Sequence, residues 1–129
     1  MGEVIYLSEC DQIENHILTI EGCMKSIEEM FALMNTGDYD MGGRNQNSHG
    51  SRISVSKENG ENLYIVMPAH LGGRFNTTGV KFHGPNRYIK GREKESNYIL
   101  VLSDGDTGEP KAIMPCNLLT TYRTAAVSA

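Results

Sequence analysis

The amino-acid sequence predicts a single α+β domain over residues 1–129, with two N-terminal helices, a mixed and largely antiparallel sheet, and a C-terminal helix. Apolar residues recur three and four positions apart between residues 20 and 34 and again after residue 117, which is the period of an amphipathic helix. The chain between these segments holds β-prone runs separated by turn signals such as Asn59-Gly60. Strands that follow helices as a block favour α+β over a parallel α/β sheet.

The N-terminal part is predicted to form a short strand and two capped helices. Residues 4–7 are apolar and β-prone, and Ser8 is a good N-cap for a helical turn that reaches about Asn15. Thr19 is the expected N-cap of the second helix, and Gly37 is expected to end it in the left-handed conformation. The apolar stripe of this helix consists of Ile20, Met24, Ile27, Phe31 and Met34.

A long polar loop and a β-hairpin are expected next. Residues 37–50 are rich in glycine and polar residues, which is typical of a functional or flexible loop. Residues 51–57 alternate between apolar and polar, and residues 63–67 return as the second strand of the hairpin. Pro68 is expected to end that strand, because proline has no N–H to donate to a sheet.

The remaining strands are expected at residues 78–83, 97–102 and 111–114. In the first of them, Val80 and Phe82 should share one face, which places Lys81 and His83 on the other. Between the first and second strands, residues 85–96 form a basic polar segment. We expect a solvated loop; contact with a cofactor phosphate is the less favoured alternative.

The C-terminal helix is predicted to start at the N-cap Asn117, after Pro115 has stopped the last strand. Arg123 is one turn from apolar residues on both sides, so it is expected at the edge of the buried stripe, either in a structural ion pair or as an anion clamp. The sequence stops at Ala129 without a C-terminal helix signal, and we expect further structure to follow. The stripe consists of Leu118, Leu119, Tyr122, Ala125, Ala126 and Ala129.

Composition narrows the functional class. The formal net charge of -4 argues against a general nucleic-acid binder. We find no apolar run long enough to span a membrane and no signal peptide at Met1, so a soluble cytoplasmic protein is expected. The three cysteines, Cys10, Cys23 and Cys116, form no CxxC pair and should be reduced and mostly buried; with the four histidines they show no metal-ligand spacing, and no metal is expected.

Lys81 is the sharpest candidate for chemistry. It lies in the middle of a short strand between valine and phenylalanine, where partial desolvation suits a carboxylate ligand or a proton carrier. The alternative is a lysine on the solvent face of an edge strand. His70 and His83 are weaker candidates for acid–base or hydrogen-bonding roles, because a lone histidine is more often structural.

Several segments resemble the ornithine cyclodeaminase/mu-crystallin family. They are RTAAVSA at residues 123–129, DGDTGEPKAIMP at residues 104–115, IVMPAHLGG at residues 65–73 and the Gly79-Val80-Lys81 strand. Their order and spacing fit over nearly the whole chain, and the resemblance is strongest to the branch that forms 2,3-diaminopropionate by NAD-dependent oxidative hydrolysis of an amino-acid conjugate. Family members are about twice this length or more, so the resemblance implies a substrate-binding and dimerisation half.

The resemblance implies roles for cationic residues. It implies that Lys81 binds the substrate carboxylate and handles a proton, and that Arg52 pairs with the same carboxylate, for which a planar guanidinium is well shaped. Arg44 is the fallback for Arg52, since the proline that precedes the arginine in several cyclodeaminases is absent here. Arg123 is implied to touch substrate or cofactor, and Ser96, or Asn97 beside it, to approach the cofactor.

The implied reaction is oxidation of an amino-acid C–N bond by NAD or NADP to an imine, followed by deamination, cyclisation or hydrolysis. No GxGxxG sequence follows a predicted strand, so the dinucleotide is expected to be bound by a half that this chain lacks. Expected partners are a small amino-acid substrate and either a second copy of the chain or a separate NAD-binding chain. The alternatives are ketimine reductase or alanine dehydrogenase-type activity, or a non-catalytic module that binds an amino acid or a partner.

Overall fold

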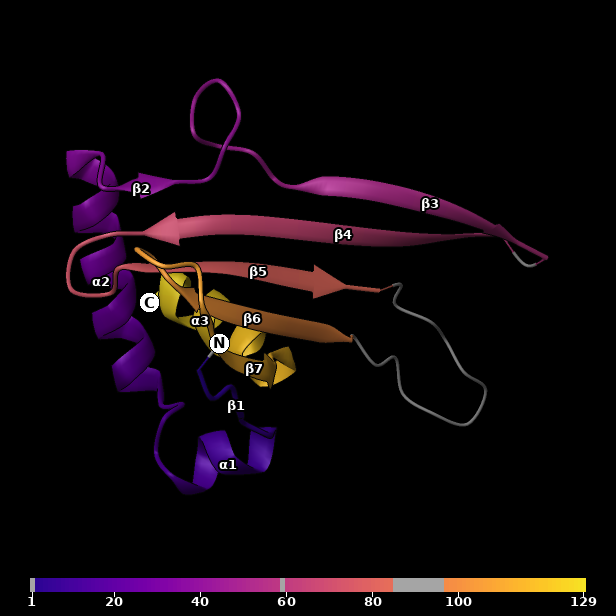
Figure 1. Ribbon diagram of the computed structural model, residues 1–129. Coiled ribbons are helices and arrows are strands. Elements are labelled where there is room, and N and C mark those ends of the chain that lie inside the picture. Colours follow the sequence, from indigo (N-terminus) through magenta and orange to yellow (C-terminus); the bar gives the residue numbers. More distant parts are fainter. Residues whose placement is uncertain (1, 59, 85–96) are drawn as a thin grey trace.

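The computed structural model describes residues 2–58, 60–84 and 97–129, and its elements confirm the predicted fold class (Figure 1). Helices and strands occur in the predicted order, with one additional strand. In chain order they are β1 (Ile5–Tyr6), α1 (Glu9–Glu14), α2 (Ile20–Thr36), β2 (Tyr39–Asp40), β3 (Ser51–Lys57), β4 (Gly60–Leu71), β5 (Thr77–His83), β6 (Tyr98–Asp104), β7 (Pro110–Pro115) and α3 (Asn117–Ser128).

The strands of the described residues form one seven-stranded sheet in the order β1-β7-β6-β5-β4-β2, with β3 also paired to β4. β1 runs parallel to β7, and the other pairs are antiparallel. β2 and β3 therefore lie along the same edge of the long strand β4, and the chain between them leaves the sheet as a loop (Figure 1).

Side-chain caps set the helix boundaries. Ser8 and Asp11 form a reciprocal capping box at the start of α1, and Thr19 accepts a hydrogen bond from the backbone at the start of α2. Gly37 ends α2 with φ 81°, as predicted. Gln12, buried in α1, donates from Nε2 to the carbonyls of residues 7 and 115, at 3.2 and 3.0 Å, and so attaches α1 to the ends of β1 and β7.

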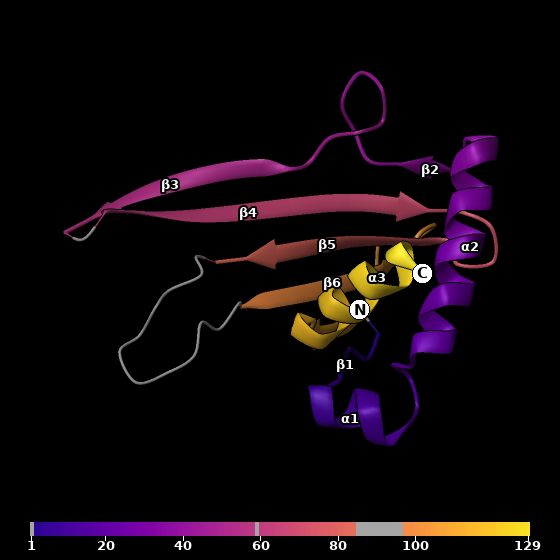
Figure 2. The same cartoon turned by 180° about the vertical axis from the view of Figure 1, so that it is seen from behind.

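α2 lies across one end of the sheet beside the β4–β5 turn, where it meets α3 (Figures 1 and 2). Two polar contacts hold this turn. The Asp38 carboxylate accepts a hydrogen bond from the Gly73 N–H at 2.8 Å. Arg74 donates two hydrogen bonds to Glu29 of α2, at 2.6 and 2.7 Å, and its guanidinium stacks 4.3 Å from the centre of the Phe75 ring.

The prediction that Pro68 ends a strand is wrong, because β4 continues through it to Leu71. The Gly72 N–H donates to the Asp38 carbonyl on the β2 side of β4, so by alternation Pro68 also turns its backbone toward that edge. Along this edge of β4, β3 pairs with residues up to Val66 and β2 pairs with His70 and Leu71. Pro68 lies between these two pairings, where the loop that joins β2 to β3 leaves the sheet. No ladder hydrogen bond is lost there, and proline is tolerated.

Two other boundaries differ from expectation. The loop predicted for residues 37–50 contains β2, whose two residues pair with the end of β4. The N-cap of α3 is Cys116, which makes no side-chain capping bond, rather than Asn117. Asn117 is the first helical residue, and its Oδ1 accepts a hydrogen bond from the Tyr98 N–H at 2.9 Å, which ties α3 to β6.

The two faces of the sheet differ in cover. Directly paired residues of neighbouring strands share a face. The face that carries Lys81 is called the cavity face. The opposite, open face carries the paired row Val66, Phe82 and Ile99, which are 38%, 41% and 42% exposed. α3 crosses one face of the sheet only, in front of it in Figure 2.

Few apolar residues are buried in the part of the chain that the structure describes. Of the apolar stripe of α2, only Ile27 is buried, and Phe31 is 51% exposed. Likewise only Ala126 of the α3 stripe is buried. The expectation of mostly buried thiols is also only partly met, since Cys10 is exposed, Cys23 half-buried and Cys116 buried, all three free. The sheet and helices therefore present apolar surface that this chain alone leaves uncovered.

Candidate functional site

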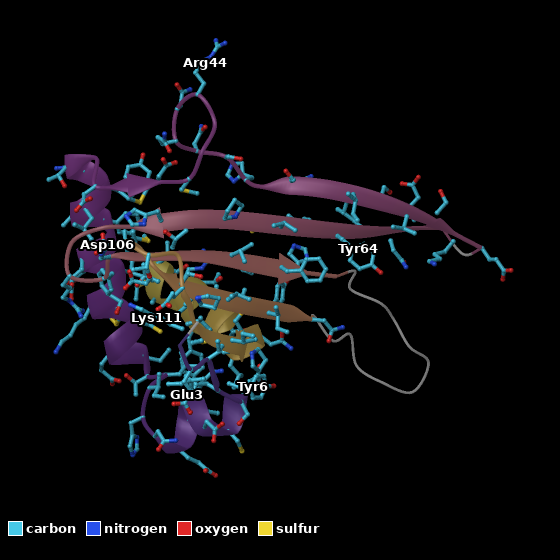
Figure 3. All side chains as sticks on the ribbon, in the orientation of Figure 1. Glu3, Tyr6, Arg44, Tyr64, Asp106 and Lys111 are labelled. Atoms are coloured by element: carbon cyan, nitrogen blue, oxygen red, sulfur yellow. The ribbon has the colours of Figure 1, made fainter. Side chains whose placement is uncertain are left out.

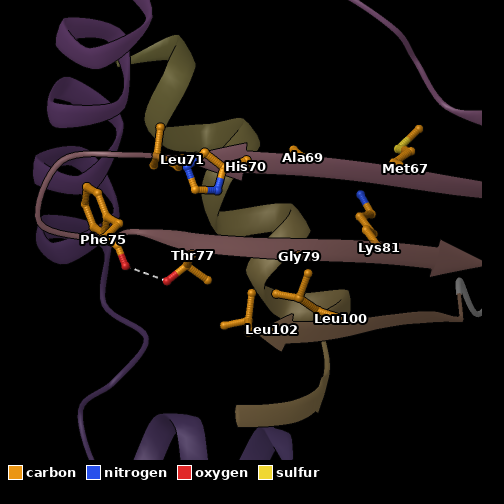
Figure 4. Close-up of a pocket in the computed structure, with 10 residues that line it drawn as sticks. All are labelled: Met67, Ala69, His70, Leu71, Phe75, Thr77, Gly79, Lys81, Leu100 and Leu102. Carbon is orange, nitrogen blue, oxygen red and sulfur yellow. Dashed lines mark hydrogen bonds between the residues drawn. The ribbon is translucent and has the colours of Figure 1, made fainter. Parts of the chain in front are cut away.

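A cavity of about 400 Å³ opens on the cavity face, above β4, β5 and β6, and ten residues line it (Figure 4). The sheet register explains its shape. Ala69, Gly79 and Leu102 form one paired row across the three strands, and its first two members are small. Longer side chains stand in the row to either side, with Lys81 on one flank and Leu71 on the other, so that the short row forms the floor.

Gly79 has a specific place in this floor. A Cβ atom added at this position would lie 2.9 Å from Cδ2 of Leu102 and 3.2 Å from the carbonyl oxygen of Val101. Glycine inside a strand weakens pairing and often marks a point of close approach by a ligand or another chain. The absence of a side chain at residue 79 keeps the centre of the cavity open.

Lys81 stands at one end of the cavity, in a row with Met67 and Leu100. Among the described lysines and arginines it alone is not exposed. Its Nζ lies 4.6 Å from the centre of the Tyr98 ring, and no described carboxylate lies within ion-pair distance of it. Lys81 therefore presents a half-buried positive charge that is held by an aromatic ring and not neutralised.

Tyr98 is a site residue that the sequence analysis missed. Its ring contacts Lys81 and also lies 5.0 Å, centre to centre, from the imidazole of His83, its directly paired neighbour. Nδ1 of His83 in turn lies 3.2 Å from the Gly84 carbonyl oxygen. The only sequence signal for this cluster is the strand alternation that puts residues 81 and 83 on one face, which the structure confirms.

Arg52 is brought to the same face as Lys81. It pairs with Ile65, which in turn pairs with His83, so Arg52 lies one row along the sheet from Lys81. Its side chain is exposed and has no hydrogen-bonded or ionic partner among the described residues. Arg44, the alternative, lies at the tip of the loop between β2 and β3 and points away from the sheet (Figure 3). Arg52 is therefore the better placed of the two.

Arg123 was expected at the edge of a buried stripe, and this expectation is wrong, because its side chain is exposed on α3. No described acid pairs with it, so the structure offers no ion pair of the kind that the sequence left open. Ser96 and the basic residues Arg87, Lys90, Arg92 and Lys94 lie outside the described residues. Asn97 is described and exposed, and its carbonyl accepts a hydrogen bond from the Gly84 N–H.

The two candidate histidines lie on opposite faces of the sheet. His83 shares the cavity face with Lys81. His70 borders the cavity but belongs by register to the opposite face, where its Nδ1 lies 2.9 Å from Oγ1 of the paired Thr78. One ring nitrogen of His70, Nδ1, is therefore engaged by a neighbour in the sheet.

The start of α3 lies close to Lys81. Cys116 is 1% exposed, and burial raises the pKa of its thiol, while the positive charge of Lys81 acts in the opposite direction. A carboxylate oxygen of Glu9 lies 3.4 Å from the Leu118 N–H and so takes up a free donor in the first turn of α3. Burial also raises the pKa of the Cys23 thiol.

The described residues form neither a metal-binding cluster nor a membrane-spanning helix. No three histidine, cysteine, aspartate or glutamate side chains gather there in a way that could hold a metal ion. None of the helices that the structure describes is long and apolar enough to cross a membrane.

Comparison with known proteins gives a family and a set of folds. Residues 3–129 match the model of the Ornithine cyclodeaminase/mu-crystallin family. The N-((2S)-2-amino-2-carboxyethyl)-L-glutamate dehydrogenase of Staphylococcus aureus (strain NCTC 8325 / PS 47) is 37% identical over 67 residues, which are 50% of this chain and 20% of that protein. This match agrees with the branch that the sequence resembled most strongly.

Solved structures share the whole fold of the chain. An archaeal alanine dehydrogenase dimer with bound NAD superposes with a TM-score of 0.69 at 25% identity, over 96% of this chain and 34% of that one. The iminosuccinate reductase of Paracoccus denitrificans, in complex with NAD+, gives 0.74 at 23% identity, over 97% and 36%. The chain thus spans about a third of the length of these proteins.

Proposed function

The chain belongs to the ornithine cyclodeaminase/mu-crystallin family, and we propose that it supplies the substrate-binding part of an enzyme that oxidises an amino-acid C–N bond to an imine with NAD or NADP. Deamination, cyclisation or hydrolysis of the imine would follow. The observation that carries the proposal is Lys81, a half-buried and unneutralised ammonium at one end of a cavity, in a family whose neighbours include amino-acid dehydrogenases.

The proposed task of this chain is to bind and orient the amino acid. Lys81 Nζ is proposed to donate hydrogen bonds to the substrate carboxylate and to move a proton during the reaction. Arg52 approaches from the neighbouring row of the same face as a second carboxylate ligand. Arg123, exposed and unpaired among the described residues, is proposed to touch substrate or cofactor from α3.

The described residues do not fit a dinucleotide by themselves. Their only parallel strand pair is β1 with β7, and no glycine-rich turn leads from a parallel strand into a helix in the described part of the chain. We therefore assign the dinucleotide to another part of the enzyme, with Arg123 and Ser96 as contacts from this chain. No residue described here is given a role in the redox chemistry itself.

A second candidate function is a binding module that takes up an amino acid without catalysis. An unneutralised lysine at one end of a cavity is sufficient for such binding. Ketimine reductase or alanine dehydrogenase-type activity would use the same Lys81 and differ only in the substrate and the preferred direction. All of these readings share one requirement, which is a carboxylate bound at Lys81.

Association is part of the proposal. The apolar residues of the open face, together with the exposed stripe of α2, need a cover. The archaeal alanine dehydrogenase with a similar fold is a dimer. We propose that this chain forms a homo-oligomer, a complex with an NAD-binding chain, or both.

The test is carboxylate binding by the full chain. Thermal unfolding with and without millimolar L-alanine should show stabilisation by the amino acid, because a ligand that binds only the folded state raises Tm. Lys81→Met should remove most of this shift, and Lys57→Met, which changes an exposed lysine of β3, should keep it. An equal shift in Lys81→Met and wild type would contradict the proposal.

The same sample separates the catalytic from the non-catalytic reading. The intact mass of the purified material identifies a co-purifying chain. NAD reduction by that complex, lost in Lys81→Met, would support the enzyme. Carboxylate binding without any NAD-bearing partner and without turnover would support the binding module.

A further inference from the structure

The ring that holds the Lys81 ammonium belongs to a residue whose backbone faces the start of α3. Tyr98 is the first residue of β6 and pairs directly with His83 of β5. The next residues outward, Gly84 and Asn97, are joined by a hydrogen bond from the Gly84 N–H to the Asn97 carbonyl oxygen at 3.2 Å. Hydrogen-bonded and non-hydrogen-bonded pairs alternate in an antiparallel ladder. The N–H and the carbonyl of Tyr98 therefore point away from β5, toward the end of β7.

The start of α3 supplies both partners of this backbone. The Cys116 N–H donates to the Tyr98 carbonyl oxygen at 3.0 Å, as it would in a continued β6–β7 ladder. In a regular ladder the Cys116 carbonyl would accept a bond from the Tyr98 N–H in return. That carbonyl instead accepts bonds from the N–H and the hydroxyl of Thr120, at 3.0 and 2.7 Å, within α3. Oδ1 of Asn117 takes its place and accepts a bond from the Tyr98 N–H at 2.9 Å.

Asn117 is therefore connected to the Lys81 ammonium through one intermediate residue. Its amide fixes the backbone of Tyr98, and the Tyr98 ring lies 4.6 Å from Nζ of Lys81. An aromatic side chain has few rotatable bonds, so its position follows that of its backbone. Without the Asn117 acceptor, the Tyr98 N–H at this half-buried strand end would lose its partner, which is unfavourable. The strand end would shift to regain a bond, and the ring would move with it.

We propose that Asn117 is a positioning residue of the carboxylate site, which holds the Tyr98 ring against Lys81 and so orients the ammonium toward a bound carboxylate. The inference rests on the proposed function, which assigns the carboxylate to Lys81. Asn117 is not among the residues that line the cavity, so its effect on a ligand passes through Tyr98. Two residues that act through one contact give non-additive effects when both are changed.

Calorimetric titration of the full chain with L-alanine provides the test, at a temperature at which circular dichroism shows every variant to be folded. Asn117→Ala removes the acceptor and should weaken binding by about two- to fivefold, the effect of losing a cation–π contact. Asn117→Asp keeps an oxygen acceptor at the same position and should restore most of the affinity. Ser128→Ala, which removes a hydrogen bond contained within α3, is the control and should bind as wild type does.

A double-mutant cycle separates positioning from a general effect on the fold. In the Tyr98→Leu background the ring is absent, so Asn117→Ala should lower Tm there without weakening L-alanine binding further. Wild-type affinity in Asn117→Ala, equal losses in Asn117→Ala and Asn117→Asp, or losses that multiply in the double variant would each overturn the inference and leave the carboxylate site intact. Equal L-alanine binding by wild type and Lys81→Met would overturn the proposed function, and the inference with it.

Discussion

The ammonium nitrogen of Lys81 lies 4.6 Å from the centre of the Tyr98 ring, on the neighbouring strand. Lys81 is paired with Leu100, and Tyr98 lies two residues before Leu100 on β6. The lysine side chain therefore reaches diagonally from β5 to the Tyr98 ring. An aromatic face attracts a cation through its quadrupole and leaves the charge intact. Lys81 is thus oriented without being neutralised, which is what a carboxylate-binding lysine requires.

Replacing this ring should weaken carboxylate binding. Tyr98→Leu removes the aromatic face, so the lysine side chain gains freedom that a bound carboxylate must then restrict. Loss of a cation–π contact of about 1 kcal/mol predicts roughly fivefold weaker binding of L-alanine by calorimetry. Tyr98→Phe keeps the ring and should bind as wild type does. Equal losses in the two variants would show that the hydroxyl, and not the ring, is responsible.

Arg123 should matter for function and little for stability. The side chain is exposed and unpaired among the described residues, so Arg123→Met should change the free energy of unfolding by less than about 1 kcal/mol in a denaturant titration. Activity of the complete enzyme should fall at least tenfold. Arg74→Met, which removes a guanidinium bonded twice to Glu29, is the matched control and should leave activity nearly unchanged. A large stability loss in Arg123→Met would contradict the proposed clamp.

A charge on the open face should prevent self-association. Phe82 is 41% exposed in a row of apolar residues, so Phe82→Lys should shift the protein to monomer in sedimentation velocity at micromolar concentration. Phe31→Lys, on the exposed stripe of α2, tests whether the helix contributes instead. A compact, stable wild-type monomer would contradict the proposed assembly.

Asp104 should contribute a pH-dependent part of the stability. Lys111 Nζ at 2.8 Å, followed by the backbone N–H groups of Thr107 and Asp106, holds the pKa of Asp104 well below its ordinary range. The pKa is lower in the folded than in the unfolded chain, so the stabilisation is full above the unfolded value of about 3.9 and is lost as pH falls below it.

Asp104→Asn provides the measurement. Its Tm should lie below that of wild type by a constant amount between about pH 5 and 8, and the difference should shrink below about pH 4. Asp106→Asn, in the same turn, should show no such dependence. A Tm difference that persists unchanged to pH 2 would mean that the carboxylate charge is not the cause.

Local signals in the sequence were sufficient for most elements. The caps at Ser8, Thr19 and Gly37 fix their helix ends through bonds made within a few residues, so a pattern of nearby residues predicts them. The alternation of residues 80–83 fixes faces in the same way, because the period of a strand is two. Pro68 and Cys116 escaped prediction because strand edges and neighbouring strands, remote in sequence, decide whether a donor is needed there.

The same distinction between local sequence signals and long-range register applies to the candidate site. The chain by itself determined that Lys81 stands on one face of its strand, and its motifs determined the family. Only the tertiary structure decided that Arg52 shares that face, that Tyr98 holds the ammonium, and that Gly79 and Ala69 meet to leave a cavity. These relations depend on the register between strands, which is set by the whole sheet and by its packing against the helices.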